Sequence, residues 1–119
     1  MMVASHRELI VWQKAMDMTV QVYRLSDRFP RNELYRLTSQ LTRAAASVPA
    51  NIAEGNARGT RRDYANFISI AKGSLNETET FLLLATRLGY LSDQQTAPTL
   101  ALVTEIGKML TALRARLMP

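Results

Sequence analysis

Apolar residues recur every three or four positions along most of this chain, which is the spacing of amphipathic helices. The first periodic segment follows Ser5 and runs to about Asp27, shortly before Pro30. Ser5 and Glu8 have the spacing of a capping box, in which two side chains bond free backbone N–H groups at a helix start. Three further periodic segments follow, over about residues 34–55, 60–88 and 93–117. The pattern therefore predicts an all-α chain with four helices.

The second segment carries a proline inside its apolar stripe. The stripe consists of Leu34, Leu37, Leu41, Ala45, Val48 and Ile52. Pro49 has no N–H for the carbonyl of Ala45 and its ring crowds that turn, which costs about 3 kcal/mol in an exposed helix. Because the stripe resumes beyond Pro49, we predict one kinked helix rather than two helices. Asn32 is a candidate cap for its start, and Gly55 and Gly59 are candidate stops.

The connections between these helices are short, which makes consecutive helices antiparallel neighbours. The first connection is the polar link RFPRNEL at residues 28–34. Thr60 is placed to cap the third helix, and Gly89 is placed to end it in the left-handed conformation. We therefore predict an antiparallel up-down-up-down four-helix bundle with a proline-kinked second helix.

The fourth helix has two possible starts. Ser92 and Gln95 form a capping box that would begin the helix at Asp93, but Pro98 leaves open a start near Thr96. Its buried line is predicted to contain Leu102, Ile106, Leu113 and either Met109 or Leu110.

The first and third helices each carry more apolar residues than one bundle core requires. One line of the first helix is Leu9, Trp12, Met16 and Tyr23, and a second is Val11, Ala15, Met18, Val22 and Leu25. The inner line of the third helix is Tyr64, Phe67, Ile68, Ala71, Leu75, Thr78, Leu82 and Ala85, and a second is Ile70, Phe81, Leu84 and Leu88. The surplus predicts self-association through Val11, Met18, Val22, Phe81 and Leu84; the alternative is a wide stripe that faces the core. Gly73 lies in the middle of the third helix, where a close backbone contact would explain it.

Length and composition fit one domain over residues 1–119, with residues 1–6 as a flexible extension. Apolar residues make up 47% of the chain, which excludes a disordered protein. No apolar run approaches the roughly 18 residues of a membrane span, and the first residues do not resemble a signal peptide, so we expect a cytoplasmic protein without a membrane partner. The absence of cysteine excludes disulfides and thiol chemistry. A net charge of +5 is compatible with an anionic partner.

Candidate catalytic or metal-binding residues are scarce. His6 is the only histidine and lies in the N-terminal extension, so it makes a poor member of a catalytic triad. The Glu-x-x-His motif of ferritin-like metal sites does not occur. We therefore predict no catalytic, cofactor-binding or metal-binding residue and no enzymatic activity, while a site made of carboxylates alone stays open.

Polar residues on faces that should pack form a predicted structural cluster of Arg43, Asn51, Glu54 and Glu77. Folding the second and third helices against each other places Arg43 near Ser74 and Glu77. The same fold places Glu54 near Arg61 and Arg62. We interpret these residues as groups that fix the helix register and donate a hydrogen bond to the carbonyl that Pro49 leaves without a partner. The alternative is a catalytic carboxylate pair.

Arginines should gather at the end of the bundle that holds both termini and the turn between the second and third helices. They are Arg7, Arg58, Arg61, Arg62, Arg114 and Arg116. Glu8, Glu54 and Asp63 lie at the same end, so six positive charges face three negative ones and leave a net charge of +3. Such a surface binds phosphate backbones without reading bases. The alternative is a solvated charged end without a ligand, and no known nucleic-acid motif accompanies the arginines.

The run QLTRAAASVPANIAEGNARG at residues 40–59, followed by GSLNETE at 73–79, resembles the family of proteins encoded in 23S rRNA intervening sequences. The resemblance extends from about Leu9 to Leu117. It implies a small antiparallel bundle that assembles as a homopentamer. A related branch, the accessory proteins of diversity-generating retroelements, implies binding to nucleic acid and to a reverse transcriptase. The chain departs from the family at Tyr35-Arg36, where a glycine usually follows the tyrosine, which leaves the geometry of the second-helix entry open.

Together these observations predict a non-enzymatic, homo-oligomeric helical bundle that binds RNA, DNA or a nucleoprotein through its basic end. One alternative is a protein-interaction scaffold that does not bind nucleic acid. Another is a small-molecule binder or enzyme that uses the lumen of the bundle or ring, which would need an enclosed pocket with convergent polar groups.

Overall fold

Four α-helices account for most of residues 5–119, the part of the chain that the computed structural model describes. They are α1 (Ile10–Ser26), α2 (Ser39–Asn56), α3 (Arg61–Arg87) and α4 (Asp93–Leu117). Short helical turns precede α1 and α2, namely η1 (His6–Glu8), η2 (Arg31–Glu33) and the π-helical η3 (Leu34–Thr38). No strand occurs within the described residues. The prediction of an all-α chain with four helices is confirmed.

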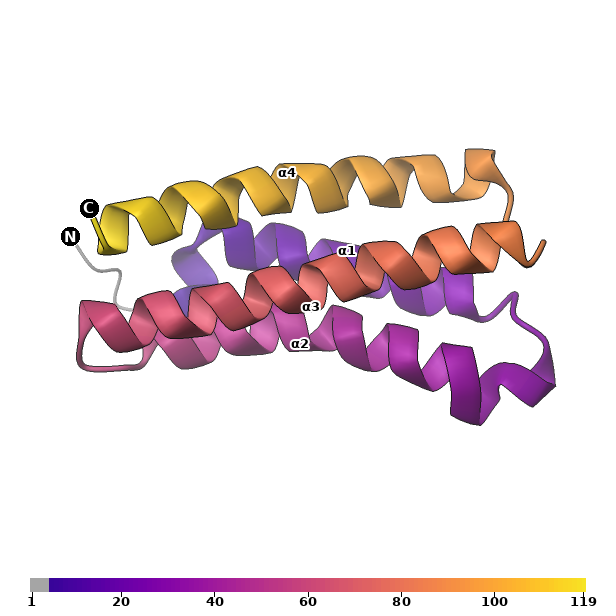
Figure 1. The fold of residues 1–119 in the computed structure, drawn as a ribbon, viewed down its shortest axis with the longest axis horizontal. Helices are drawn as coiled ribbons and strands as arrows, with labels where there is room; N and C mark the ends of the chain where they lie inside the picture. Colours follow the sequence, from indigo (N-terminus) through magenta and orange to yellow (C-terminus); the bar gives the residue numbers. More distant parts are fainter. Residues whose placement is uncertain (1–4) are drawn as a thin grey trace.

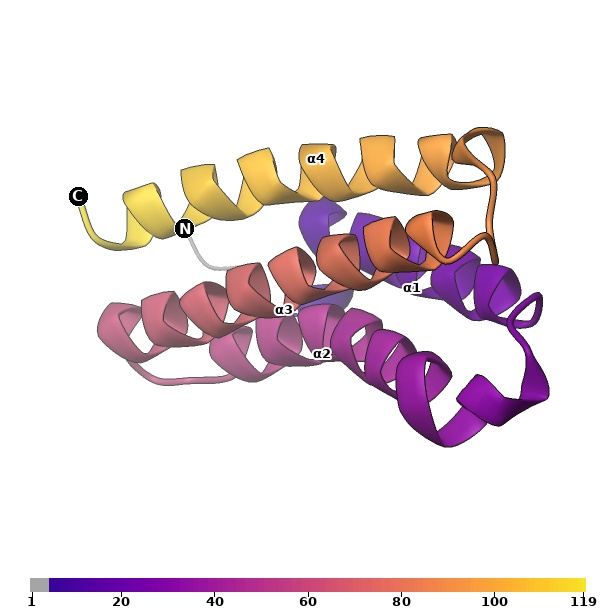
Figure 2. The same cartoon turned by 45° about the vertical axis from the view of Figure 1, so that its right-hand side comes forward.

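The helices lie side by side along the long axis of the molecule (Figure 1). Helix α1 packs against α2 and α4, and α3 also packs against α2 and α4. Helices α1 and α3 are therefore diagonal partners in the bundle, an arrangement that can also be followed in the turned view of Figure 2. The extents are 44 × 25 × 20 Å, so the shape is elongated. Helix α4 begins at Asp93, and the predicted capping box between Ser92 and Gln95 is present.

Only one of the two apolar lines of α1 is buried in the core. Val11, Met18 and Val22 are buried against the other helices of the same chain, so assigning these three to an oligomer interface was wrong. Trp12 is only partly buried and Tyr23 is exposed. The physical reason is side-chain shape, because compact residues let α1 approach its neighbours closely, while Trp and Tyr keep their polar atoms at the surface.

The core lines of α3 and α4 follow the predicted periodicity, with local differences. Buried residues of α3 are Tyr64, Ala65, Ile68, Ala71, Ser74, Leu75, Thr78, Leu82 and Ala85. Phe67 is only partly buried. In α4 the buried residues include Val103, Ile106 and Leu110, whereas the predicted Leu102, Met109 and Leu113 are only partly buried. The close contact predicted for Gly73 is absent within residues 5–119, since a Cβ atom there would meet nothing within 4 Å.

The entries into α1 and α2 differ from the predicted caps. Ser5 accepts a hydrogen bond from the backbone N–H of Arg7 and caps the single turn η1, and α1 begins only at Ile10. The capping box between Ser5 and Glu8 was therefore wrong. The predicted flexible extension lies mostly in residues 1–4, outside the described residues, whereas His6 packs edge-on against Trp12 with the ring centroids 5.0 Å apart.

The chain enters α2 through η2 and η3, so Asn32 does not cap α2. Arg36 has the non-helical angles φ −118° and ψ −108°. The irregular helix entry therefore lies at the residue where the sequence analysis left the entry geometry open.

The predicted glycine stops of α2 were also wrong. Gly55 lies inside the helix and is buried, and a Cβ atom there would lie 2.9 Å from the Cβ of Phe67. Gly55 is therefore needed for the close contact between α2 and α3 rather than for a helix stop. Among the described residues only Gly89 has a positive φ, of 83°. Gly89 and Tyr90 donate their backbone N–H groups to carbonyls in the last turn of α3, as in a Schellman motif.

Candidate nucleic-acid interface

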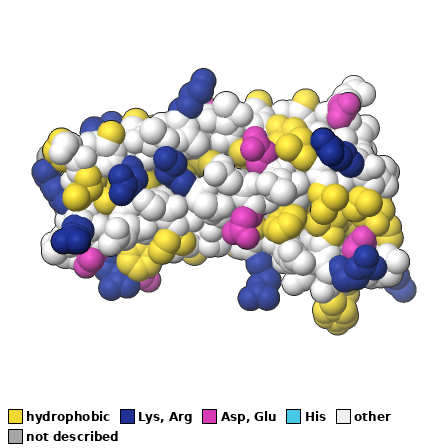
Figure 3. Space-filling view, viewed as in Figure 1, with side chains coloured by type: hydrophobic (Ala, Val, Ile, Leu, Met, Phe, Trp, Pro, Cys, Tyr) yellow, Lys and Arg dark blue, Asp and Glu magenta, His cyan; other side chains and the backbone are white. Residues whose placement is uncertain are grey.

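One end of the bundle is rich in arginine. Both described ends of the chain and the connection between α2 and α3 lie at this end in Figure 1, and Figure 3 shows Lys and Arg side chains gathered over the same end. Six exposed arginines belong to these segments, and we call them the basic end: Arg7, Arg58, Arg61, Arg62, Arg114 and Arg116. The fold therefore brings together side chains that are up to 109 positions apart in the sequence.

Two of these arginines are held by neighbouring side chains. Arg58 pairs with Glu54 at 3.1 Å, and its guanidinium lies 4.6 Å from the centre of the Phe67 ring. Arg114 donates a hydrogen bond of 2.6 Å from Nε to the hydroxyl of Ser69 on α3. Both contacts position a guanidinium at the surface between two helices.

The other four arginines, Arg7, Arg61, Arg62 and Arg116, form no ion pair among the residues that the structure describes. Arg61 and Arg62 occupy the first turn of α3, where Thr60 caps the helix by accepting from the N–H of Asp63 at 3.1 Å. A positive helix N-terminus adds to the charge of these two guanidinium groups. These four arginines are therefore the ones best able to bind a phosphate oxygen.

Tyr64 lies beneath the basic end and is buried. Burial raises the pKa of its hydroxyl, and the positive charge of Arg116 offsets part of that rise. Tyr64 therefore stays neutral at ordinary pH and adds no negative charge at this end.

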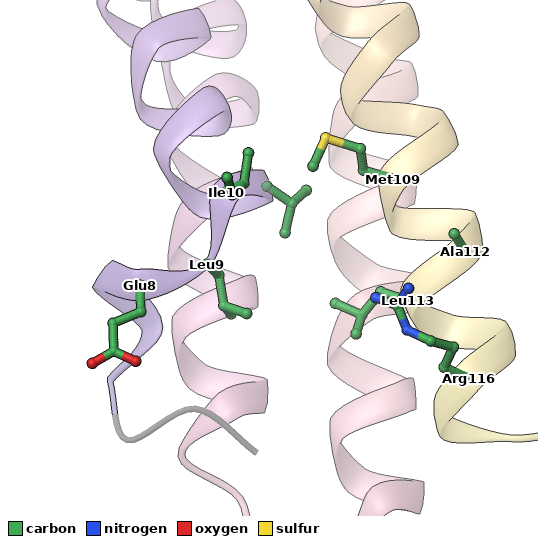
Figure 4. A pocket seen from close by; sticks show the side chains of 8 residues that line it. Glu8, Leu9, Ile10, Met109, Ala112, Leu113 and Arg116 are labelled. Atoms are coloured by element: carbon green, nitrogen blue, oxygen red, sulfur yellow. The ribbon is translucent and has the colours of Figure 1, made fainter. Parts of the chain in front are cut away.

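A hollow of about 380 Å³ lies between the start of α1 and the end of α4, next to the basic end. Figure 4 shows Leu9, Met109 and Leu113 directed into it, while the carboxylate of Glu8 points away. Arg116 reaches toward the opening from α4. The lining is mainly apolar, so the hollow offers an arginine at its rim rather than a set of convergent polar groups.

The predicted structural cluster divides into two parts. Arg43 and Glu77 line one open groove between α2 and α3, as their predicted proximity requires. Asn51 donates to the carbonyl and the hydroxyl of Ser47, both at 2.8 Å, and the hydroxyl of Ser47 lies 2.9 Å from that of Ser74. Ser47 and Ser74, which also line this groove, connect α2 to α3, and Asn51 holds Ser47 from within α2.

Glu54 belongs to neither of these contacts. It pairs with Arg58 rather than with Arg61 or Arg62, so that part of the prediction was wrong. The reason is local, because Arg58 follows Glu54 by only four positions, just beyond the end of α2, and its guanidinium folds back onto the last turn of that helix.

The sequence analysis missed a buried glutamate at the opposite end of the bundle. Only 4% of the surface of Glu33 is exposed, and its Oε2 accepts a hydrogen bond of 2.7 Å from the hydroxyl of Tyr90. Arg36 lies 3.3 Å from its other oxygen. The hydrogen bond from Tyr90 lowers the pKa of Glu33 despite a desolvation effect in the opposite direction, and the same bond raises the pKa of Tyr90. No periodic signal links residues 33 and 90, so only the fold reveals the pair.

Metal and membrane sites were also sought in the described part of the chain. Residues 5–119 contain no group of three or more His, Asp or Glu side chains arranged to hold a metal ion. Their helices include none with the length and apolar character that crossing a membrane requires.

Comparison with known proteins places the chain in a family. A family model described as 23S rRNA-intervening sequence protein matches residues 7–112. The chain is also similar to a protein of unknown function from the S23 ribosomal protein family of Bacteroides thetaiotaomicron, known from a crystal structure at 1.70 Å resolution. The two are 30% identical with a TM-score of 0.81, and the match covers 88% of this chain and 98% of the other. A search among curated proteins finds no match. The chain belongs to the family of 23S rRNA-intervening sequence proteins.

Proposed function

We propose that this protein is a non-enzymatic homo-oligomer, of five copies by family resemblance, that binds the phosphate backbone of RNA or DNA in the cytoplasm. The observation that carries the proposal is the basic end, where six exposed arginines from four segments surround one end of the bundle. The proposal takes the bundle as up-down-up-down, with α2 bent at Pro49. A ring of such bundles would repeat the basic end and concentrate its positive charge.

The chemistry of the basic end favours backbone contacts over base recognition. Arginine forks match phosphate oxygens, and neutralising phosphates releases counterions whatever the base sequence. Two aromatic residues of α3 at this end are not free to stack on bases, because Tyr64 is buried and Arg58 covers Phe67. The proposed ligand is therefore structured RNA or duplex DNA bound with little base specificity. The family name refers to 23S rRNA, which makes structured RNA the first ligand to test.

The test measures binding of the purified protein to labelled structured RNA and duplex DNA across a salt series. The test variant replaces three of the four arginines that form no ion pair within the described residues, Arg61→Ala, Arg62→Ala and Arg116→Ala together. A control variant removes the same charge from exposed arginines at the opposite end of the bundle, Arg28→Ala, Arg31→Ala and Arg87→Ala. We expect the test variant to lower the slope of log K against log salt by about 2 to 3 for each subunit that contacts duplex DNA, since each phosphate contact contributes about 0.9.

Two outcomes would contradict the proposal. One is the absence of binding at low salt, and the other is an equal loss of affinity in the two variants. The second would show that net charge rather than the basic end determines binding.

The main alternative is a protein-interaction scaffold that binds no nucleic acid. Exposed apolar residues on α1 and α3 are the observation in its favour. A partner bound through such surfaces would stay bound at high salt, because burial of apolar area does not depend on charge screening. A small-molecule site in the hollow near Arg116 has less support, since its lining is mainly apolar.

A further inference from the structure

The open groove between α2 and α3 is lined by polar and charged side chains from both helices. Its volume is about 370 Å³, within the range of roughly 300–1,000 Å³ that is usual for small-molecule sites. Residues three or four positions apart on each helix line it, namely Gln40, Arg43 and Ser47 of α2 and Ser74, Glu77 and Phe81 of α3. We call this surface the α2–α3 groove. Its lining on α3 begins at Ser74, twelve positions and about 18 Å along the helix from Arg62, so the groove is separate from the basic end.

The serine pair in this groove retains a hydroxyl hydrogen that the chain itself does not use. The side-chain nitrogen of Asn51 lies 2.8 Å from the carbonyl oxygen of Ser47 and 2.8 Å from its hydroxyl oxygen. Because an amide nitrogen only donates, the Ser47 hydroxyl oxygen accepts from Asn51. The hydroxyl oxygens of Ser47 and Ser74 lie 2.9 Å apart, so one of their two hydrogens lies between them whichever serine donates. The other hydrogen has no acceptor within residues 5–119.

This spare donor is placed to bind a ligand in the groove. Ser74 is only 7% exposed, and both serines line the groove. Buried polar groups normally have a hydrogen-bond partner, and leaving one without a partner is costly. An acceptor atom of a ligand in the groove would satisfy the spare hydrogen of the pair.

Opposite charges lie on the two walls of the groove without meeting. Arg43 on α2 and Glu77 on α3 both line it, and neither forms an ion pair among the residues that the structure describes. An arginine fork matches a carboxylate through two parallel hydrogen bonds, and a carboxylate accepts from an ammonium group. A purely anionic ligand would be repelled by Glu77, and a purely cationic one by Arg43. The ligand that suits both walls therefore carries a negative and a positive group together.

The groove also has an apolar part. Phe81 is partly buried and lines the groove from α3. Ala44 lines it from α2, and its small side chain leaves space between the two walls. A ligand with an apolar group can therefore bury that group against Phe81 while its charges stay near Arg43 and Glu77.

We propose that the α2–α3 groove binds a free α-amino acid with an apolar side chain. Arg43 and the spare hydroxyl hydrogen of the serine pair bind its carboxylate, and Glu77 binds its ammonium group. Phe81 contacts its side chain. The site uses neither the basic end nor self-association, so it stands apart from the proposed function.

The test is a nuclear magnetic resonance titration of the isotope-labelled full chain with L-phenylalanine as the probe. Two analogues each lack one charge: N-acetyl-L-phenylalanine has no ammonium group, and phenethylamine has no carboxylate. We expect saturable shifts at the backbone amides around Ser47, Ser74 and Glu77 with L-phenylalanine. Each analogue should bind about tenfold more weakly, because it loses hydrogen bonds that involve a charged group.

Charge variants assign each end of the ligand to one wall. In Glu77→Gln the preference for L-phenylalanine over its N-acetyl analogue should disappear, and in Arg43→Gln the preference over phenethylamine should disappear. The matched controls are Asp17→Asn and Arg24→Gln, which remove the same charges from exposed positions of α1. Both controls should bind all three probes as the parent protein does.

A serine variant separates ligand binding from a structural role. Ser47→Ala combined with Ser74→Ala removes the spare donor, and it should weaken binding of the two carboxylate-bearing probes while leaving phenethylamine unchanged. A similar loss for all three probes would show that the serines only hold the helices together and would remove them from the site.

Other results would overturn the proposal. The absence of saturable shifts around the groove with L-phenylalanine contradicts the site itself. Equal affinity of the parent protein for the three probes contradicts recognition of a zwitterion. An equal loss of affinity in the control variants would show that overall charge, rather than Arg43 and Glu77, determines binding.

Discussion

The hydroxyl of Thr19 lies 3.1 Å from the carbonyl oxygen of Ala45, the carbonyl that Pro49 leaves without its helical N–H donor. The same hydroxyl lies 2.8 Å from the carbonyl of Ala15 in its own helix. A side chain of α1 thus donates a hydrogen bond to the backbone of α2 where the proline interrupts the helical hydrogen bonds. This contact explains how the sequence can hold a proline inside a buried helix.

Loss of the Thr19 hydroxyl should therefore cost more when Pro49 is present. We expect Thr19→Val to lower the free energy of unfolding by about 1 to 2 kcal/mol, because it leaves a buried carbonyl unsatisfied. In a Pro49→Ala background the N–H of the new alanine can bond the Ala45 carbonyl, so the same substitution should cost less. Urea denaturation of the four proteins gives the coupling between the two sites. An equal cost in both backgrounds would show that the contact does not compensate for the proline.

The Glu33–Tyr90 hydrogen bond should make stability depend on pH on the acid side. The folded pKa of Glu33 lies below its ordinary value of 4.5, so the stabilisation is present above about pH 4.5 and is lost as the pH falls through the folded pKa. Tyr90→Phe removes the principal cause of the lowered pKa. The difference in free energy of unfolding between parent and variant should therefore be largest near pH 6 and should shrink toward pH 3.

Urea denaturation from pH 7 to pH 3 checks this expectation. Tyr23→Phe is the control, because Tyr23 is exposed and should show no such trend. A difference between parent and Tyr90→Phe that stays constant over the whole range would show that Tyr90 stabilises the fold by packing alone.

Gly55 and Gly73 should respond in opposite directions to a methyl group. Gly55→Ala forces a Cβ atom against Phe67 and Tyr64 and should destabilise the fold by about 1 to 3 kcal/mol. Gly73→Ala adds a methyl group to an exposed helix position and should stabilise the monomer by up to about 1 kcal/mol. Thermal melts of both variants at several protein concentrations separate these effects from assembly. A tolerated Gly55→Ala would indicate that α2 and α3 can move apart without cost.

The choice between the two apolar lines of α1 can be tested with its methionines. Met18 is fully buried, whereas Met16 is 40% exposed. We expect Met18→Ala to cost about 2 to 5 kcal/mol, in the range of core truncations, and Met16→Ala to cost less than about 1 kcal/mol in a monomeric background. Chemical denaturation of both variants provides the comparison. Similar costs at the two positions would contradict the separation of core line and outer line.

The sequence alone determined the class of the fold, because helical periodicity and helix ends are local properties. The capping box of Ser92 and Gln95 and the left-handed Gly89 act within a few residues of the chain, and both occur where the sequence predicted them. The run at residues 40–59 was also enough to indicate the family, and the gathering of arginines at one end followed from the order of the helices.

Only the tertiary structure decided which surfaces are inside and which groups are partners. Both apolar lines of α1 have helical spacing, and packing against α2 and α4 buried the line that contains Met18. Thr19 and Ala45, like Glu33 and Tyr90, are far apart in the sequence, and no local rule pairs them. Burial and long-range hydrogen bonds depend on how helices approach one another, which periodicity along a single helix does not specify.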